Sequence, residues 1–414
     1  MANRALSIMP FYGGKAKMAE FISDRLDYSS TDTYVEMFGG AARTLLNKPR
    51  HKEEYYNDYS SGLCTIMEAM SSPDTAREFI HRAAEAEASQ EEFDRAKALY
   101  DECEADQEET YRVLIKAEVI KSKIYEHKTQ AFINKELDKF IEWAAYVSDE
   151  SVKPDCVDKI IPIIQQAPDG DLWLRNWILA YQAKNEGTLE RTNHLLNVPD
   201  MDLAVATYIV FTQSRDARGQ VRSEERFRDS GQFRQRALNL YQCAERMEGV
   251  QVSQLDAMAF FRRYTFIHDT IPGSPLPDDM QRNLLNTWIN DSRVMMYADP
   301  SYIKVESEKE LLEGIDWENE DSLTAAIDKK YEGKKMPKNL GDVYVKSFGY
   351  NEQEAFLRCI QHAKCKVLVS NYDLILYNKY LTPELGWRRE EFHTTTGVGS
   401  KKDNRRVEVI WYNY

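Results

Sequence analysis

A short apolar stretch that ends in Asp-Pro constrains the fold of this chain more than any other feature. Val294–Ala298 is predicted to be a buried strand, and Asp299-Pro300 ends it because proline lacks the amide that a sheet ladder needs. A carboxylate, a rigid turn and the ring of Tyr302 therefore follow the carboxyl end of the strand. Open α/β sheets bind their ligands at that edge. An ordinary strand and turn would have the same sequence, so the interpretation depends on the rest of the chain.

Two segments near the amino terminus predict the first strands of such a sheet. The stretch Thr33–Thr44 predicts a strand, a glycine turn at Gly39-Gly40 and then a helix through Leu45 and Leu46. Glu54–Asp58 predicts a second strand that ends in an acid, Asp58. An acid in that place commonly hydrogen-bonds ribose hydroxyls, and the spacing from Phe38 to Asp58 fits the ~20 residues expected. Because the turn lacks the full Gly-x-Gly-x-x-Gly pattern, a nucleoside ligand is favoured over a pyrophosphate.

Another glycine pair precedes these strands, in the segment Phe11-Tyr12-Gly13-Gly14-Lys15. Two glycines let the backbone approach a ligand closely at the start of a helix, where an anion is favoured, and Lys15 adds a positive charge. The alternative is a glycine-rich turn with a solvated lysine. The segment becomes a candidate ligand site only in combination with the sheet edge.

The composition indicates a globular protein without a membrane span. Hydrophobic residues make up 43% and charged residues 29%, and no apolar run approaches the ~20 residues that a span needs. The amino terminus lacks the basic and apolar regions of a secretory signal. Six scattered cysteines without a Cys-x-x-Cys pair predict a reduced, cytoplasmic setting. Seven histidines without a His-x-x-x-His pair predict no metal site.

The net charge of −14 argues against a nucleic-acid partner unless the charge is segregated along the chain. Arginines do gather between Phe211 and Arg236. They are Arg215, Arg218, Arg222, Arg226, Arg228, Arg234 and Arg236. This stretch favours a hairpin or loop laid along a phosphate backbone, with Arg215, Arg218 and Arg222 as DNA-contacting candidates. The alternative is a solvated loop with local Arg–Glu pairs.

Between the two α/β regions the chain reads as helical. Long, charged, glycine-poor stretches dominate from about Gly62 to Pro199. Trp173, Trp177 and Tyr181 lie at a spacing of four along one helical face. Such a stripe is typical of core packing. The segment is therefore predicted to be a helical insertion between two halves of one α/β domain.

The carboxyl-terminal region supplies the remaining strands. Val250–Val252 is predicted to be a third strand, with Asp256 just after it, and Cys365–Asn371 a later one. Arg406–Tyr412 alternates like a final strand and is expected to be the antiparallel edge of the sheet. The loop before it carries three further basic candidates for DNA contact, Lys401, Lys402 and Arg405.

Taken in order, these segments resemble the Dam-type (alpha-group) DNA adenine-N6 methyltransferases. Phe11 to Lys15 is similar to the amino-terminal block of that family, and Glu36 to Ala41 to its cofactor loop. Asn57-Asp58 resembles the ribose-binding acid, and Asp299 to Tyr302 the catalytic Asp-Pro-Pro-Tyr. Ser301 stands where the family has its second proline, and the cofactor loop reads Phe-Gly-Gly-Ala-Ala where Phe-x-Gly-x-Gly is frequent. The resemblance covers the two ends of the chain and the region from about Met201, but not the helical segment.

The resemblance implies a Rossmann-like methyltransferase sheet, mostly parallel with an antiparallel edge strand, plus a helical insertion and a target-recognition region. It implies S-adenosyl-L-methionine as the methyl donor and the N6 amine of an adenine, flipped out of double-stranded DNA, as the acceptor. The implied catalytic residues are Asp299, Pro300 and Tyr302. The implied cofactor-binding residues are Phe11, Tyr12, Lys15, Glu36, Phe38, Gly39, Gly40, Asp58, Asp256 and Asp299. The expected divisions are 1–61 and 241–414 for the catalytic domain, 62–200 for the insertion and 201–240 for target recognition.

Three other functions stay open at this stage. Methylation of the cytosine N4 amine uses similar chemistry, whereas attack at cytosine carbon is disfavoured because no Pro-Cys dipeptide occurs. A catalytically silent DNA-binding homologue is the second, and Ser301 in place of the second proline is the feature that favours it. A helical scaffold without chemistry is the third, and it does not account for the ordered motifs. The resemblance also implies a bacterial or phage source, and a restriction endonuclease is a candidate functional counterpart; the recognition sequence and the oligomeric state are left open.

Overall fold

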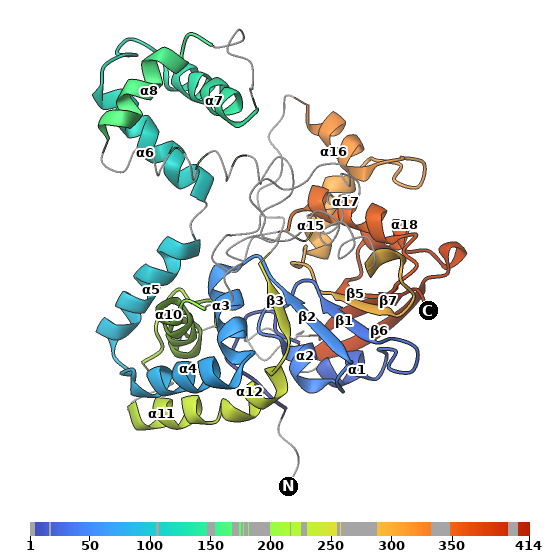
Figure 1. Ribbon diagram of the computed structural model, residues 1–414. Coiled ribbons are helices and arrows are strands. Elements are labelled where there is room, and N and C mark those ends of the chain that lie inside the picture. Colours follow the sequence, from blue (N-terminus) through green and yellow to red (C-terminus); the bar gives the residue numbers. More distant parts are fainter. Residues whose placement is uncertain are drawn as a thin grey trace. The chain divides into compact units, whose positions relative to one another are not determined.

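The computed structural model describes residues 5–15, 18–104, 107–146, 154–167, 174, 177, 181, 199–215, 217–224, 230–254, 257, 288–332, 348–395 and 405–414. The chain divides into two compact units. The first contains residues 1–103 and 191–414, and the second contains residues 104–190. Figure 1 shows the seven-stranded sheet of the first unit with its flanking helices.

The sheet of the first unit has the strand order β3-β2-β1-β4-β5-β7-β6. Its strands are β1 (Thr33–Glu36), β2 (Glu53–Asn57), β3 (Gln251–Ser253), β4 (Val294–Ala298), β5 (Lys366–Tyr372), β6 (Arg388–Thr395) and β7 (Arg405–Tyr412). The pairs from β3 through β5 are all parallel. Apart from β7, which pairs antiparallel with both β5 and β6, the sheet is therefore parallel, as expected from the sequence.

The edge of the sheet differs from the expectation. The final strand, β7, is antiparallel but lies between β5 and β6, so the edge strand is β6. The sequence of β6, Arg-Arg-Glu-Glu-Phe-His-Thr-Thr, did not predict a strand because it contains a single large apolar residue, Phe392. Charged side chains are typical of an edge strand, where they discourage pairing with another chain.

Helices cover both faces of the sheet because the buried strands are apolar on both sides. The helices of one face are α1 (Ala19–Ser23), α2 (Arg43–Asn47), α3 (Ser61–Met70), α4 (Pro73–Glu85), α10 (Met201–Gln213), α11 (Ser230–Leu238) and α12 (Tyr241–Met247). Those of the other face are α15 (Val305–Leu312), α16 (Leu323–Tyr331), α17 (Tyr350–Ile360) and α18 (Ile375–Tyr380), with a 3₁₀ turn at Pro383–Leu385. Side chains alternate between the two cores along a strand: Met295 and Tyr297 enter the first, Val294 and Met296 the second.

The second unit contains α6 (Gln107–Lys121), α7 (Gln130–Tyr146) and α8 (Val157–Gln166). Its core includes Val119, Phe140 and Ile160, together with Trp177, which is 1% exposed. Tyr181 packs against the same core, so the described members of the aromatic stripe are core residues as predicted. Trp173 lies outside the described residues.

The compact helical unit begins later than the insertion expected from the sequence. Helices α3 and α4, and α5 (Gln90–Glu104) up to Cys103, belong to the first unit. The physical reason is packing: Gly62 of α3 lies against Thr207 of α10 so closely that an added Cβ would come within 2.3 Å of its hydroxyl oxygen. Helix α10 packs on both α3 and α4. A glycine-poor helical composition alone does not distinguish these helices from those of the second unit.

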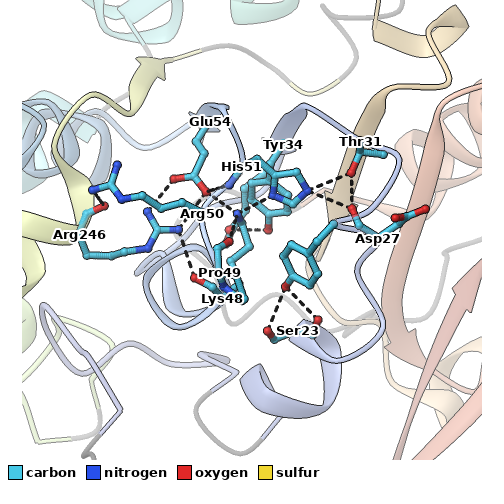
Figure 2. Close-up of polar contacts among 12 residues, drawn as sticks. Ser23, Asp27, Thr31, Tyr34, Lys48, Pro49, Arg50, His51, Glu54 and Arg246 are labelled. Carbon is cyan, nitrogen blue, oxygen red and sulfur yellow. Dashed lines mark hydrogen bonds and ion pairs between the residues drawn. The ribbon is translucent and has the colours of Figure 1, made fainter.

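A buried polar cluster fixes the amino-terminal end of β2 to α12 (Figure 2). The Glu54 carboxylate pairs with the Lys48 ammonium and accepts hydrogen bonds from Arg246 at 2.6 and 3.0 Å. Lys48 Nζ also lies 3.0 Å from Nδ1 of His51 and 4.0 Å from the centre of the Tyr34 ring. Two buried cations thus share one buried carboxylate at the end of the sheet opposite to the carboxyl ends of the strands.

Among the described residues, no helix combines the length and the apolar character that crossing a bilayer requires.

Candidate active site

The register of the sheet brings the sequence-predicted acids together at the carboxyl ends of its parallel strands. Glu36 of β1 pairs with Tyr56 of β2 on one side and with Tyr297 of β4 on the other. Two residues further along each strand, Asp58 and Asp299 therefore lie at the same level, at the carboxyl ends of strands that flank β1. Two strand spacings separate them, which is roughly 10 Å.

The Asp299 carboxylate is held by two donors from distant segments. Lys15 Nζ lies 2.8 Å from Oδ1, and the Ser370 hydroxyl donates to the same oxygen at 2.8 Å. Within the part of the chain that the structure describes, Oδ2 of Asp299 accepts no hydrogen bond. Burial raises the pKa of Asp299 above its ordinary value, and the Lys15 ammonium and the Ser370 hydroxyl oppose that rise.

Lys15 connects Asp299 to the aromatic side of the site. It is 8% exposed, and its ammonium also lies 3.8 Å from the Glu408 carboxylate. The same ammonium lies 4.1 Å from the centre of the Tyr302 ring, and the Tyr302 hydroxyl donates to Glu408 at 3.0 Å. The Tyr302 ring, edge-on to Tyr372 at 4.6 Å, is thereby fixed relative to Asp299. One buried cation thus contacts two acids and one ring.

The glycine turn after β1 is tied to Asp58. The Gly40 amide donates to Asp58 Oδ2 at 2.8 Å, and the Ser60 amide donates to Oδ1 at 2.9 Å. Gly40 has a φ of +50°, which favours glycine. Gly39 is required for space, because a Cβ there would lie 2.0 Å from the Tyr56 ring. The turn and the acid therefore form one unit at the carboxyl ends of β1 and β2.

Glu36, which the resemblance assigns to the cofactor, is 2% exposed. The Tyr34 hydroxyl donates to its Oε2 at 2.8 Å. Burial raises the pKa of Glu36 to about 8, so this side chain carries a proton at neutral pH. The Glu36 side chain is buried inside the sheet, below the carboxyl ends of the strands where Asp58 and Asp299 lie.

Ser301, the departure from Asp-Pro-Pro-Tyr, stabilises the turn after β4. Its hydroxyl accepts from the Phe348 amide at 2.8 Å and donates to the Phe348 carbonyl at 3.0 Å. The Gln353 side chain donates to the Ser301 carbonyl at 2.7 Å. The Phe348 ring in turn packs against Phe38 at 5.0 Å. The serine thus supplies contacts that a proline could not make, and the backbone of the turn stays fixed.

The described residues 214–215 and 217–222 of the arginine-rich stretch form a hairpin loop beside the amino-terminal glycine segment, whereas Arg234 and Arg236 lie on α11. Ser214 and Arg222 form an antiparallel bridge, and the Arg215 amide donates to the Val221 carbonyl at 2.8 Å. The Tyr12 amide donates to the Ala217 carbonyl at 3.1 Å, and the Arg218 guanidinium lies 4.2 Å from the centre of the Tyr12 ring. Tyr12 therefore faces the hairpin.

Phe11 links the same hairpin to the glycine turn. Its ring lies 5.3 Å from that of Phe211 at the end of α10. A Cβ added at Gly40 would lie 3.3 Å from the Phe11 ring. The segment that carries Lys15 is thereby packed between the arginine-rich hairpin and the edge of the sheet.

The three hairpin arginines have different surroundings. Arg215 is exposed, whereas Arg218 and Arg222 are half-buried. Arg222 donates to the Ala88 carbonyl at 2.6 Å and to the Gln213 side chain at 3.1 Å. Its guanidinium therefore fastens the hairpin to the loop before α5.

Three predicted residues, Asp256, Lys401 and Lys402, lie outside the described residues. The backbone of Arg405 belongs to β7, where it pairs with Thr395 of β6.

Two residues of the site, Ser370 and Glu408, were not singled out from the sequence. Ser370 is fully buried on β5, and the parallel pairing of Ala298 with Val369 sets it beside Asp299. A hydroxyl directly after the apolar run Val367–Val369 is the signal that could have identified it. Glu408 lies on the antiparallel strand opposite Tyr372, a pairing that the sequence does not give.

A family model described as D12 class N6 adenine-specific DNA methyltransferase matches residues 11–154. The matched residues include Lys15, the glycine turn and Asp58. They also include much of the helical segment that the sequence resemblance left out, and they end before Asp299. No curated protein matches the chain.

Proposed function

We propose, from the premise that the chain belongs to the D12 class of N6 adenine-specific DNA methyltransferases, that Asp299, Lys15 and Asp58 form its active site. Enzymes of this family methylate the adenine N6 amine of DNA and take the methyl group from S-adenosyl-L-methionine. One observation carries the assignment: the Asp58 unit and the Lys15–Asp299 pair lie at the carboxyl ends of the two strands that flank β1.

The residues at the carboxyl ends of these strands fit S-adenosyl-L-methionine, the methyl donor. S-adenosyl-L-methionine, when bound, supplies a methyl group already activated by a sulfonium. We assign Asp58 to the ribose hydroxyls, because a carboxylate after the second strand of such a unit commonly accepts from them. The backbone of Gly39 and Gly40, together with Lys15, would hold the methionine end. Glu36 and Phe38 support this surface from within, through Tyr34 and Phe348 respectively.

Asp299 would activate the acceptor amine. The lone pair of the adenine amine is delocalised into the ring, so a hydrogen-bond acceptor must draw the nitrogen toward a tetrahedral shape. With Oδ1 engaged by Lys15 and Ser370, Oδ2 of Asp299 is positioned to accept one amine hydrogen, and the Pro300 carbonyl the other. The Tyr302 ring would stack on the purine.

The reaction then balances as a direct displacement. The N6 lone pair forms the new nitrogen–carbon bond, the electrons of the carbon–sulfur bond pass to sulfur, and the nitrogen loses one proton to water. Because the methyl group is already activated, the chain contributes orientation and preorganised charge. Asp299 acts as an acceptor throughout, so it must be ionised.

Access to the amine in double-stranded DNA requires that the adenine leave the stack, at a cost of a few kcal/mol. We propose that the hairpin of residues 214–222 contacts the duplex, with exposed Arg215 on a phosphate or a base edge and Arg218 placed by Tyr12. Arg222 contributes by holding the hairpin. Arg405 and the loop before it are further candidates. We place the reaction in the cytoplasm and propose a restriction endonuclease as the functional counterpart.

The test is methylation of duplex DNA with labelled S-adenosyl-L-methionine, followed by digestion and mass spectrometry of the nucleosides. We expect N6-methyladenine and no N4-methylcytosine. Asp299→Ala should abolish the product while DNA binding is retained. Full activity of that variant would remove Asp299 from the mechanism.

Two controls separate chemistry from folding. Asp328→Ala changes an exposed aspartate on α16 and should leave the rate unchanged. Addition of S-adenosyl-L-methionine should raise the Tm of the wild-type protein by mass action. A raised Tm without product would instead identify a cofactor-binding homologue that has lost turnover.

A further inference from the structure

Ser370 occupies a position that the parallel register of β4 and β5 dictates. Ala298 pairs with Val369, so the next residues along each strand, Asp299 and Ser370, face each other on the same side of the sheet. The Ser370 hydroxyl lies 2.8 Å from Asp299 Oδ1 and 3.0 Å from the Tyr297 hydroxyl. Ser370 is 0% and Tyr297 is 1% exposed. The hydroxyls of Ser370 and Tyr297 are therefore both shielded from solvent.

Tyr297, Ser370 and Asp299 are joined by two hydrogen bonds, and the donor in each of them can be assigned. A serine hydroxyl has one hydrogen, and an ionised carboxylate can only accept. The Ser370 hydrogen is therefore directed at Asp299, and the Tyr297 hydroxyl donates to Ser370. Burial raises the pKa of Tyr297 well above its ordinary value, so this phenol keeps its proton. The order Tyr297, Ser370, Asp299 orients one lone pair of Oδ1 from inside the sheet.

The hydrogen bond from Ser370 also fixes the rotation of the Asp299 carboxylate, which Lys15 alone would leave variable. The Lys15 ammonium lies near Asp299, Glu408 and the Tyr302 ring at once, so it attracts the Asp299 carboxylate without fixing its rotation. A second donor from a neighbouring strand fixes the plane of the carboxylate. Oδ1 is then held by the protein, and Oδ2 is left for the amine of the proposed substrate.

We propose that Ser370 is a positioning residue for methyl transfer: with Tyr297 behind it, it holds Asp299 Oδ1 so that Oδ2 meets the N6 amine of the target adenine. The proposal rests on the function assigned to Asp299 above. Ser370 touches no reacting atom, and it acts through Asp299.

The first measurement is a split of kcat from KM. Ser370→Ala should lower kcat about 10- to 100-fold, the range of a misplaced catalytic group, and change KM for DNA and for S-adenosyl-L-methionine only slightly. Ser370→Thr keeps the hydroxyl and should recover most of the rate. Ser370→Cys keeps a side chain of the same connectivity but offers a weak donor, and it should resemble Ser370→Ala. Ser23→Ala removes another buried serine hydroxyl, remote from Asp299 and bonded to Tyr28, and should leave kcat unchanged.

The second measurement is the acid limb of the kcat–pH profile, which a merely structural serine would not move. Loss of a donor to the carboxylate raises the pKa of Asp299, so the limb should shift to higher pH in Ser370→Ala and Ser370→Cys. The other titratable groups around Asp299 are unchanged in these variants. They are Lys15, Glu36, Tyr297, Tyr377 and Glu408.

The outcomes separate this proposal from the assignment of Asp299. If Asp299→Ala is inactive while Ser370→Ala, or Ser370→Cys should the alanine variant unfold, keeps the wild-type kcat and acid limb, the positioning role is wrong and the active site stands. If Asp299→Ala is fully active, the assigned function fails regardless of Ser370. A lowered kcat with a shifted limb and recovery by threonine supports the proposal.

Discussion

Lys15 Nζ lies 2.8 Å from Oδ1 of Asp299, and both side chains are largely buried. The lysine follows a glycine pair near the amino terminus, and the aspartate ends a strand of the carboxyl-terminal half. Removal of one member of a buried ion pair is costly because the other charge stays uncompensated. The contact therefore couples the amino-terminal segment to the turn after β4, where we propose the catalytic residues lie.

Lys15→Met is expected to lower kcat by more than tenfold near neutral pH. Without the ammonium, Asp299 and Glu408 face each other as like charges, and the pKa of Asp299 rises beyond the value that burial already imposes. The fraction of Asp299 that is ionised falls, and the acid limb of the rate profile moves to higher pH. A kcat–pH series for both proteins measures the shift. An unchanged limb would mean that Lys15 does not set the charge state of Asp299.

Glu36→Gln is expected to stabilise the protein at pH 8 relative to the wild type and to change little at pH 5. The pKa of Glu36 is raised to about 8 from an ordinary 4.5, so between these values the folded state holds a proton that the unfolded state has released. Stability from this group is fully present below the ordinary pKa and is lost as pH rises toward 8, by up to about 1.4 kcal/mol per pH unit. Glutamine keeps the shape and does not titrate.

Thermal unfolding of both proteins across this pH window checks the prediction. The difference in Tm between Glu36→Gln and the wild type should grow steadily with pH. A difference that is constant with pH would show that Glu36 is ionised in the folded protein.

The two glycine turns, the strand ends and the acids that follow the strands were predictable from the sequence. Each depends on local chemistry: proline ends a strand, glycine permits a close turn, and an acid after a strand marks the ligand edge. Tertiary pairing was not predictable in the same way. The edge strand β6 is polar because one side of it meets water, so its sequence lacks the apolar pattern of a strand.

The partners of Asp299 illustrate the same limit. Asp299 was assigned from its own motif, but Ser370 reaches it only through the register of β4 and β5, and Glu408 reaches Lys15 only through the antiparallel return of β7. Likewise, the charge of Arg222 suggested DNA contact, whereas its hydrogen bonds to Ala88 and Gln213 depend on how the hairpin packs. Composition gives the charge of a side chain but not its partner.

Arg215→Ala and Arg222→Ala are expected to act differently. Arg215 is exposed on the hairpin, so its loss should weaken DNA binding severalfold, reduce the salt dependence and leave the Tm unchanged. Loss of the Arg222 guanidinium leaves the Ala88 carbonyl and the Gln213 side chain without their donor, and should lower the Tm. Salt-dependent DNA titrations and thermal unfolding distinguish the two. Equal loss of affinity without a change in Tm would make Arg222 a direct DNA contact.

Glu54→Gln is expected to destabilise the protein while the specific activity of the folded fraction is kept. The side chains of Lys48 and Glu54 are 0% and 4% exposed, and Arg246 shares the same carboxylate (Figure 2). Neutralising that carboxylate leaves two buried cations, at a cost of about 3–5 kcal/mol.

Burial already lowers the pKa of Lys48 to about 8, and loss of its counter-charge lowers it further. Between the folded and the ordinary pKa the unfolded state then binds the proton that the folded state lacks, so the stability contributed by this lysine rises with pH. The Tm deficit of the variant should therefore be large at pH 7 and smaller at pH 9, and thermal unfolding at the two values measures it. A deficit that does not narrow with pH would mean that Lys48 keeps its proton without Glu54.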